Sequence, residues 1–285
     1  MAYQSIRINY FSGTGTTALA AEAFEAAFRA QGAAVTVQEI RRAGETADGG
    51  EDLLLLMFPV HAWNAPKPVY EWIKQLPKAE KKDAAVIAVS AGGEAGINSA
   101  CRRSSIRRLA NRGYRAVYEG MIVMPSNYGS PSPHNDTVRL LRVLPHKADK
   151  MAGEILSGKQ RHPKPGLSAR IVSRLMEIEK FGARVFGNGL GATAECNGCG
   201  WCARECPGAN IRMADEQPAF GRQCVMCMRC IYGCPQSAIE AKRMGGVVIA
   251  DGFSVQSMRQ QAETAEVGSE PDEQTWDGVR QYLKE

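Results

Sequence analysis

Eight of the nine cysteines lie between Cys196 and Cys234, and they fall into two runs of the same spacing. The runs CNGCGWCARECP and CVMCMRCIYGCP both read C-x2-C-x2-C-x3-C-P. The second begins 28 residues after the first, and Ile211 and Ile239 stand at the same offset after the two Cys-Pro pairs. A small unit has therefore been duplicated. Its thiols, which are metal ligands when deprotonated, are Cys196, Cys199, Cys202, Cys206, Cys224, Cys227, Cys230 and Cys234.

This spacing suits clusters of iron and sulfide. Three thiolates that are separated by two residues can bend around one cubane and bind three of its irons, so the fourth iron needs a ligand from elsewhere. Zinc is the alternative, because C-x2-C pairs also build zinc ribbons. Zinc needs only two pairs for each ion, however, and it explains neither the third cysteine, nor the Cys-Pro ending, nor the repeat. The pattern therefore predicts iron–sulfur clusters.

Over about residues 190–243 the chain closely resembles the bacterial-type ferredoxins that hold two [4Fe–4S] clusters. In that family the fourth cysteine of each run binds the other cluster. The resemblance implies that cluster I is held by Cys196, Cys199, Cys202 and Cys234, and cluster II by Cys224, Cys227, Cys230 and Cys206. The small residues Gly198, Gly200 and Gly233 would let backbone N–H groups approach the sulfurs, which tunes the reduction potential.

A second stretch, SGTGTT at residues 12–17, has the composition of a phosphate cradle. It lacks the lysine of a Walker loop, and Ala18 stands where the dinucleotide motif has its third glycine. The partial positive charge of a helix N-terminus can nevertheless hold a phosphate without a cationic side chain. Backbone N–H groups and hydroxyls would do so, from Ser12, Gly13, Thr14, Gly15, Thr16 and Thr17.

Residues 4–156 resemble the flavodoxins, whose FMN phosphate lies in a Ser/Thr/Gly loop after strand 1. The resemblance implies FMN as a cofactor and a parallel sheet of strand order 2-1-3-4-5. Two positions depart from the family pattern: Thr16 stands where Asn is frequent, and polar Asn9 precedes Tyr10. Threonine can still donate a hydrogen bond to phosphate, so the first departure is mild.

In flavodoxins the loops after strands 3 and 4 enclose the flavin ring. Here these loops are VHAWNAP and SAGGEAG. The candidates for ring contacts are Trp63, Asn64, Ser90, Gly92 and Gly93. The alternative for Trp63 is a packed loop aromatic, and His61 is interpreted as a hydrogen-bonded loop histidine rather than a catalyst. Asn127 and Tyr128 follow strand 5 and would lie at the same end of the sheet.

Alternating strand and helix patterns position these loops. Strands are expected at residues 5–10, 33–40, 52–60, 84–90 and 116–124, and helices at 17–31 and between Pro66 and Pro77. The Arg-rich residues 101–115 are assigned as a helix by their place in the order, and a last helix, interrupted at Pro145, runs to about Leu156. Successive β-α units predict a doubly wound α/β sheet with helices on both faces.

The chain is accordingly divided into a flavodoxin-like, FMN-binding domain (1–157), a basic helical connector (158–188), a small α+β ferredoxin-like domain (189–243) and a tail (244–285). In the connector one helix is expected, with Ile171, Leu175, Ile178 and Val185 on one side. WDGVRQYL in the tail suggests a short closing helix. Cys101 stands apart from the runs and is interpreted as a small buried apolar residue.

Length and charge set limits on the function. The 285 residues carry a net charge of +5, and no signal peptide or membrane-length apolar run is seen, so a cytoplasmic protein is expected. The Arg-rich stretches are read as solvated surface or, alternatively, as a docking patch for an acidic partner. No nucleic-acid motif is present, and the thiols are expected to stay in a reducing compartment as metal ligands.

The order of parts resembles the flavodoxin–ferredoxin fusion proteins of anaerobic microbes. This implies an electron-transfer oxidoreductase that relays electrons between FMN and two [4Fe–4S] clusters, with redox proteins, including acidic ones, as partners. Two alternatives stay open: a flavoenzyme that reduces a small substrate with electrons from the clusters, and a flavin-free ferredoxin on a docking scaffold. No set of residues for acid–base or nucleophilic catalysis is implied by spacing, so no catalytic residue is assigned.

Overall fold

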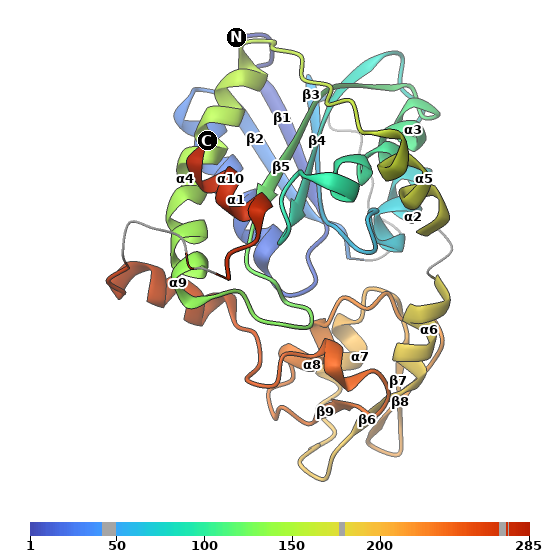
Figure 1. Cartoon of the computed structure of the whole chain (residues 1–285). Coiled ribbons are helices and arrows are strands. Elements are labelled where there is room, and N and C mark those ends of the chain that lie inside the picture. The colour runs from blue at the N-terminus through green and yellow to red at the C-terminus, as the bar shows by residue number, and fades with distance from the viewer. Residues whose placement is uncertain (42–49, 177–179, 268–271, 273) are drawn as a thin grey trace.

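The computed structural model describes residues 1–41, 50–176, 180–267, 272 and 274–285. Five parallel strands form one sheet in the order β2-β1-β3-β4-β5, which confirms the expected flavodoxin-like topology (Figure 1). The strand order reverses at β1, which pairs with β2 on one side and β3 on the other. The strands are β1 (Ser5–Tyr10), β2 (Ala34–Glu39), β3 (Leu53–Pro59), β4 (Lys82–Ser90) and β5 (Tyr114–Val123).

Helices cover both faces of this sheet because its central strands are apolar on both sides. In β3, Leu53, Leu55 and Met57 pack toward α1 (Thr16–Ala30) and α4 (His134–Leu156). The intervening Leu54 and Leu56 pack toward α2 (Lys67–Gln75) and α3 (Arg103–Ala110). Helix α4 runs through Pro145 without a break, so the expected interruption there is wrong. Packing of Leu144 and Ala148 on the core holds the helix across the proline.

The Arg-rich stretch is partly a buried network rather than a solvated surface. Arg102 is 1% exposed, pairs with Glu94 and Glu119, and donates to the carbonyl oxygen of Gly120 at 3.2 Å. It links the loop after β4, which includes the 3₁₀ turn η1 (Gly96–Ala100), to strand β5. Cys101 beside it is fully buried, and burial raises the pKa of its thiol to about 11, which agrees with its reading as a small apolar residue.

The described part of the connector holds the helical segments α5 (Leu167–Met176) and α6 (Lys180–Asn188), and residues 177–179 between them lie outside the description. Ile178 lies outside the described residues, and Ile171 and Leu175 are exposed rather than packed. Ahead of α5 the chain is tied to the edge of the sheet, because the Arg161 carbonyl oxygen accepts from Glu119 N at 2.9 Å. Helix α5 packs on η1 and thereby lies beside the carboxyl end of β4.

The cysteine segment, residues 189–243, is small and mixed, as expected. Strands β6 (Leu190–Ala192) and β9 (Ile239–Ala241) form one antiparallel pair, and β7 (Ile211–Ala214) and β8 (Gln217–Phe220) form another. Ile211 and Ile239, which match in the duplication, begin β7 and β9 and pack together with Cys202. Two short helices, α7 (Trp201–Glu205) and α8 (Arg229–Tyr232), complete the segment, which lies beyond the carboxyl ends of the large sheet (Figure 1).

The tail returns to the α/β part through η2 (Gly245–Val247), α9 (Val255–Thr264) and α10 (Asp277–Lys284). Helix α10 confirms the expected closing helix, and α9 packs on α4. Lys147 in α4 donates to the Tyr282 carbonyl oxygen at 2.7 Å and lies over the Tyr282 ring. Among the described helices none is long and apolar enough to cross a bilayer.

Candidate functional site

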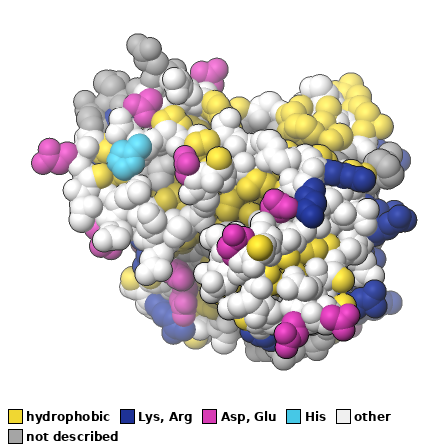
Figure 2. All heavy atoms as spheres, turned by 90° about the horizontal axis from the view of Figure 1, so that it is seen from below, with side chains coloured by type: hydrophobic (Ala, Val, Ile, Leu, Met, Phe, Trp, Pro, Cys, Tyr) yellow, Lys and Arg dark blue, Asp and Glu magenta, His cyan; other side chains and the backbone are white. Residues whose placement is uncertain are grey.

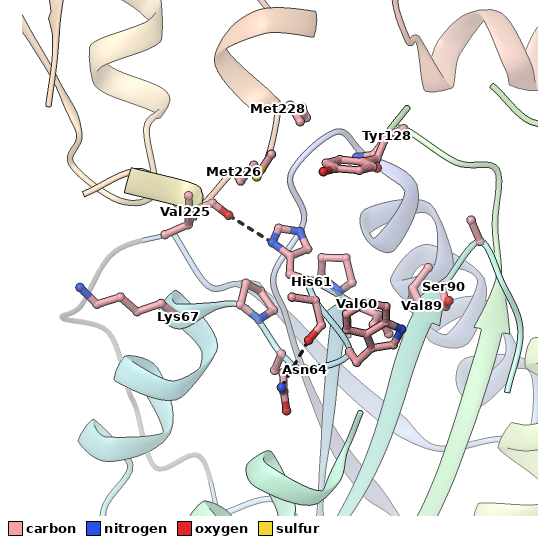
Figure 3. A pocket seen from close by; sticks show the side chains of 18 of the residues that line it. Val60, His61, Asn64, Lys67, Val89, Ser90, Tyr128, Val225, Met226 and Met228 are labelled. Carbon is pink, nitrogen blue, oxygen red and sulfur yellow. Dashed lines mark hydrogen bonds between the residues drawn. The ribbon is translucent and has the colours of Figure 1, made fainter. Parts of the chain in front are cut away.

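A cavity of about 810 Å³ opens where the carboxyl ends of the strands face the cysteine segment (Figure 3). The loops after β3, β4 and β5 contribute His61, Ser90 and Tyr128, and the cysteine segment contributes Cys224 and Met226. Helices α5 and α6 close one side through Met176, Ala183 and Arg184, and the tail adds Trp276. The cavity therefore lies at the switch point of a parallel α/β sheet, where such folds bind ligands.

The loop at residues 12–17 has the form of an anion cradle. The backbone N–H groups of Gly15 and Ala18 donate to Ser12 Oγ at 3.1 and 3.3 Å, which draws the loop around the start of α1. Gly15 caps that helix with a φ of 104°, a left-handed value that favours glycine. No acidic residue stands in the first turn of α1, whose leading N–H groups have no intrahelical partner.

Thr17 provides the clearest sign that this loop fits a phosphate. Its hydroxyl is buried and has no hydrogen-bond partner among the residues that the structure describes. A buried polar group without a partner is costly, and a phosphate oxygen would satisfy it. Thr16 lines the cavity directly, whereas Thr14 Oγ1 accepts a hydrogen bond from Asn127 Nδ2 at 2.8 Å. The residues present thus fit a phosphate group at the edge of the cavity, as the flavodoxin resemblance implies for FMN.

The cysteine segment lies on the outer side of this loop. A Cβ atom at Gly13 would overlap the carbonyl oxygen of Cys227, so only glycine permits this approach. Arg229 donates to the carbonyl oxygens of Ser12 and Gly13, at 2.5 and 3.3 Å, and forms an ion pair with Glu39. The loop therefore obtains a neighbouring cation from 217 residues away in sequence. Arg229 stands within the second cysteine motif, so nothing in the sequence around it indicates that it contacts this loop.

A strained turn follows β3. His61 and Asn64 exchange backbone hydrogen bonds at 2.8 and 2.9 Å, and the two residues between them, Ala62 and Trp63, have φ values of 45° and 55°. This is the pattern of a type I′ turn, in which Asn-Gly is the usual pair. Such strain in non-glycine residues clusters at functional sites. Here it places Trp63 in the cavity wall, where the sequence had suggested a ring contact.

The other predicted ring contacts divide into two kinds. Ser90 and Gly92 line the cavity, and Ser90 Oγ accepts from Gly92 N and Asn98 Nδ2 at 3.2 and 3.0 Å. Gly93 instead packs against Gly278 of α10, so the tail covers this part of the loop. Asn64 reaches the cavity, but its side chain is engaged with Ser173 of α5 through bonds of 2.7 and 2.9 Å. Sequence reasoning had no local signal for either tertiary contact.

The eight clustered cysteines form two neighbouring groups. Burial is the main reason that the pKa of Cys202 is raised. The neighbouring Cys234, Cys196 and Cys199 raise this pKa further through their charge. Burial is also the main reason that the pKa of Cys230 is raised, and the charges that raise it further are chiefly those of Cys227, Cys224 and Cys206. These are the two ligand sets that the ferredoxin resemblance implies. Burial likewise raises the pKa of Cys224 to about 12 and of Cys227 to about 11, so both thiols need a bound metal to be deprotonated at neutral pH.

Backbone groups support the sulfurs in both groups. Met226 N donates to Cys224 Sγ and Asn210 N to Cys206 Sγ, each at 3.3 Å, and Ala238 N donates to Cys234 Sγ at 3.4 Å. Such bonds stabilise thiolates that bind iron. Within the described residues, no group of three or more His, Cys, Asp or Glu side chains is arranged to hold a single metal ion. In a cubane each thiolate binds a separate iron, which requires a wider arrangement.

Comparison with known proteins gives structural matches of low sequence identity that cover about half of this chain. A flavodoxin from the domain Archaea covers 53% of this chain and 99% of its own, with 12% identity and a TM-score of 0.37. The flavodoxin of Streptococcus pneumonia TIGR4 has 19% identity over 53% of this chain and 99% of its own (TM-score 0.36). A mutant flavodoxin from Pseudomonas aeruginosa has 15% identity over 54% of this chain and 97% of its own (TM-score 0.42). No family model and no curated protein matches the chain.

His61 joins the cavity to the second cysteine run. Its Nδ1 lies 3.2 Å from the Val225 carbonyl oxygen, and burial lowers the pKa of the ring from 6.5 to about 4 (Figure 3). The imidazole is therefore neutral at pH 7. With a proton on Nδ1 it donates to Val225, which agrees with the expectation of a hydrogen-bonded loop histidine.

This pKa predicts a specific pH dependence of stability. Between pH 6.5 and 4 the unfolded chain binds a proton at His61 that the folded protein does not, so stability falls as the pH falls. From pH 7 to 5.5 we expect a loss of about 1 kcal/mol, or a decrease in Tm of about 2–4 °C. In the His61→Gln variant, which keeps an N–H donor for Val225, this part of the decrease should disappear. Equal decreases in the two proteins would contradict the assignment.

Proposed function

We propose that the chain is an electron-transfer flavoprotein that holds FMN in the cavity and two [4Fe–4S] clusters in the cysteine segment. One observation carries this proposal: the cavity is bounded by the phosphate cradle at Thr16 and by the second cysteine run at Cys224. A flavin held by the cradle would thus lie beside the cysteines of cluster II. On this basis we group the chain with flavodoxin–ferredoxin fusion proteins, divided at residues 157, 188 and 243.

The residues of the cradle and cavity would bind and orient the flavin. Thr16, Thr17 and the N-terminus of α1 would hold the phosphate, while Trp63 and Gly92 would enclose the ring. Apolar side chains such as Val225 and Met226 exclude water from the side that faces the cysteines. The flavin supplies the ability to accept electrons in pairs and release them singly, whereas each cluster carries one.

The cysteine sets would hold the clusters. Cluster I would take Cys196, Cys199, Cys202 and Cys234, and cluster II would take Cys224, Cys227, Cys230 and Cys206; the cysteines whose charges act most on Cys202 and Cys230 support this division. His61, neutral and bonded to Val225, fixes the second run relative to the loop after β3. The protein's own contribution is therefore placement, exclusion of water and hydrogen bonding to sulfur.

Cofactor content and one cradle variant test this proposal. Protein purified without oxygen should contain about one FMN and two [4Fe–4S] clusters per chain, measured by chromatography of the released flavin and by iron and sulfide analysis. Thr17→Val should weaken FMN binding about tenfold or more, because it removes a donor to a charged group. Its stability without FMN should not fall, since the hydroxyl has no partner among the described residues.

Thr36→Val, at an exposed position of β2, is the matched control and should bind FMN like the wild type. Iron without flavin, even after incubation with excess FMN, would contradict the proposal and favour a ferredoxin on a docking scaffold. FMN bound equally by both threonine variants would contradict the cradle assignment.

The partner we propose is an acidic redox protein. Lys164, Arg170 and Arg174 of the connector are exposed and carry positive charge. Electron exchange with an acidic ferredoxin should therefore slow several-fold when ionic strength rises from about 0.01 to 1 M, as the Debye length shrinks from about 30 to 3 Å. A rate that does not respond to salt would exclude this docking mode.

A second candidate function is reduction of a small anionic compound at the flavin. The cavity is roofed by the connector and by Trp276 of the tail, and its described lining includes Lys67, Arg184 and Arg222 but no Asp or Glu. Such a lining favours a planar, α,β-unsaturated carboxylate, whose C=C bond would accept a hydride equivalent from the reduced flavin and a proton from water. Reoxidation of the reduced protein by arylacrylates should then saturate with concentration, and Lys67→Gln should weaken this saturation. Reoxidation that stays strictly linear would rule out a bound substrate.

A further inference from the structure

The duplication allows the two cysteine runs to be compared position by position. Residues 28 apart are equivalent, so Gly198 corresponds to Met226 and Gly200 corresponds to Met228. All four have left-handed backbone: φ is 73° and 70° at the glycines and 55° and 61° at the methionines. Glycine adopts this conformation freely, whereas a residue with a Cβ is disfavoured in it. The second run therefore carries side chains at two places where its own duplicate has none.

Those two side chains face the cavity. Met226 and Met228 both line it, together with Cys224, and Figure 3 shows them on the side of the cavity opposite the loop after β3. Met228 is 3% exposed and also packs with Phe186 and Leu190. Met226 is partly buried and packs against the same cluster, so both methionines combine a packing role with a place in the cavity wall. The two residues with strained backbone, Met226 and Met228, thus belong to the same wall of the cavity.

Contacts with the α/β part come from the second run as well. Arg229 donates to the loop at residues 12–17, and Tyr232 Oη donates to the Asn127 carbonyl oxygen at 3.1 Å. The first run takes no part in lining the cavity, and its Cys199 is exposed. The duplicated unit therefore has an inner half, residues 224–235, which lines the cavity, and an outer half, residues 196–207, which does not line it but pairs with the α/β part through Glu205 and Arg41 at 3.4 Å.

We propose that the inner half passes electrons to the flavin across a wall made by Met226 and Met228, and that the outer half exchanges electrons with external redox proteins. This inference rests on the proposed function. A reduced ferredoxin would give one electron to cluster I, and cluster II would pass it inward. Two such transfers, with a proton from water, reduce one oxidised FMN while two donor ferredoxins are oxidised.

Methionine suits this wall for a physical reason. Its thioether is polarizable, makes favourable contacts with aromatic rings, and excludes water without adding charge. A flavin ring in the cavity would meet two such groups beside Cys224 of cluster II, which lines the same wall. Leucine at the same place would retain the apolar surface, and glycine would remove it.

The chain offers a matched control for this substitution. Met244 also has left-handed backbone, with a φ of 59°, but it is 43% exposed and does not line the cavity. Met226→Gly and Met244→Gly therefore relieve the same kind of strain, and only the first alters the cavity. The experiment measures FMN affinity for the full chain by fluorescence titration, and follows reduction of the holoprotein by a reduced two-cluster ferredoxin in a stopped-flow instrument.

We expect Met226→Gly to weaken FMN binding about two- to tenfold, the range expected for a lost sulfur–aromatic contact. Bleaching of the flavin should slow, while the earlier bleaching of the clusters should not. Met226→Leu should recover most of the affinity, and Met244→Gly should match the wild type in both phases. If Met226→Gly behaves like Met244→Gly, the methionine wall is wrong although the relay stands. If the wild type binds no FMN at all, the proposed function fails and this inference fails with it.

Discussion

The seating of the second cysteine run on the loop at residues 12–17 is the contact on which the arrangement of the site depends. Arg229 bonds to two carbonyl oxygens of that loop, and the Cys227 carbonyl oxygen fills the space that a side chain at Gly13 would need. The contact brings the cysteines to the carboxyl ends of the strands and turns an open switch-point crevice into a walled cavity. Without it, the cysteine segment would not close this side of the cavity.

Two further segments, α5 and α10, complete the cavity. Asn64 and Ser173 bind α5 to the turn after β3. Gly278 lets α10 approach the backbone of Gly92 closely, and the Lys147 ammonium group holds the same helix through the Tyr282 carbonyl oxygen. The bonds to Ser173 engage the Asn64 side chain, which would otherwise be available to a ligand in the cavity.

Local sequence patterns were sufficient to predict the parallel sheet and the small mixed fold of the cysteine segment. Strand β1 has the predicted bounds, and the apolar run of β3 specified burial on both faces, because an all-apolar strand can only be stable there. Pro145 shows the limit of such signals: its local preference to break the helix is overcome by packing of its neighbours on the core.

The contacts that shape the site are not visible in sequence, because they join residues that are far apart in the chain. Nothing near Arg229 indicates that it binds the loop at residues 12–17, and nothing near Gly93 indicates that α10 covers it. The glycines of both loops were noted for a ligand, and some of them serve close packing of protein on protein instead. A glycine indicates that another group approaches the backbone closely, but it does not indicate whether that group is a ligand or another part of the protein.

A duplicated unit that docks on a unique surface must lose its symmetry, and this explains the divergence of the two runs. Positions that set the cysteine spacing stay the same, since each run must bend around the same kind of cluster. The intervening positions are free to change where they face the partner surface, and Gly198 and Gly200 correspond there to Met226 and Met228. The difference between the runs therefore lies at left-handed positions between the cysteines, and in the second run these positions line the cavity.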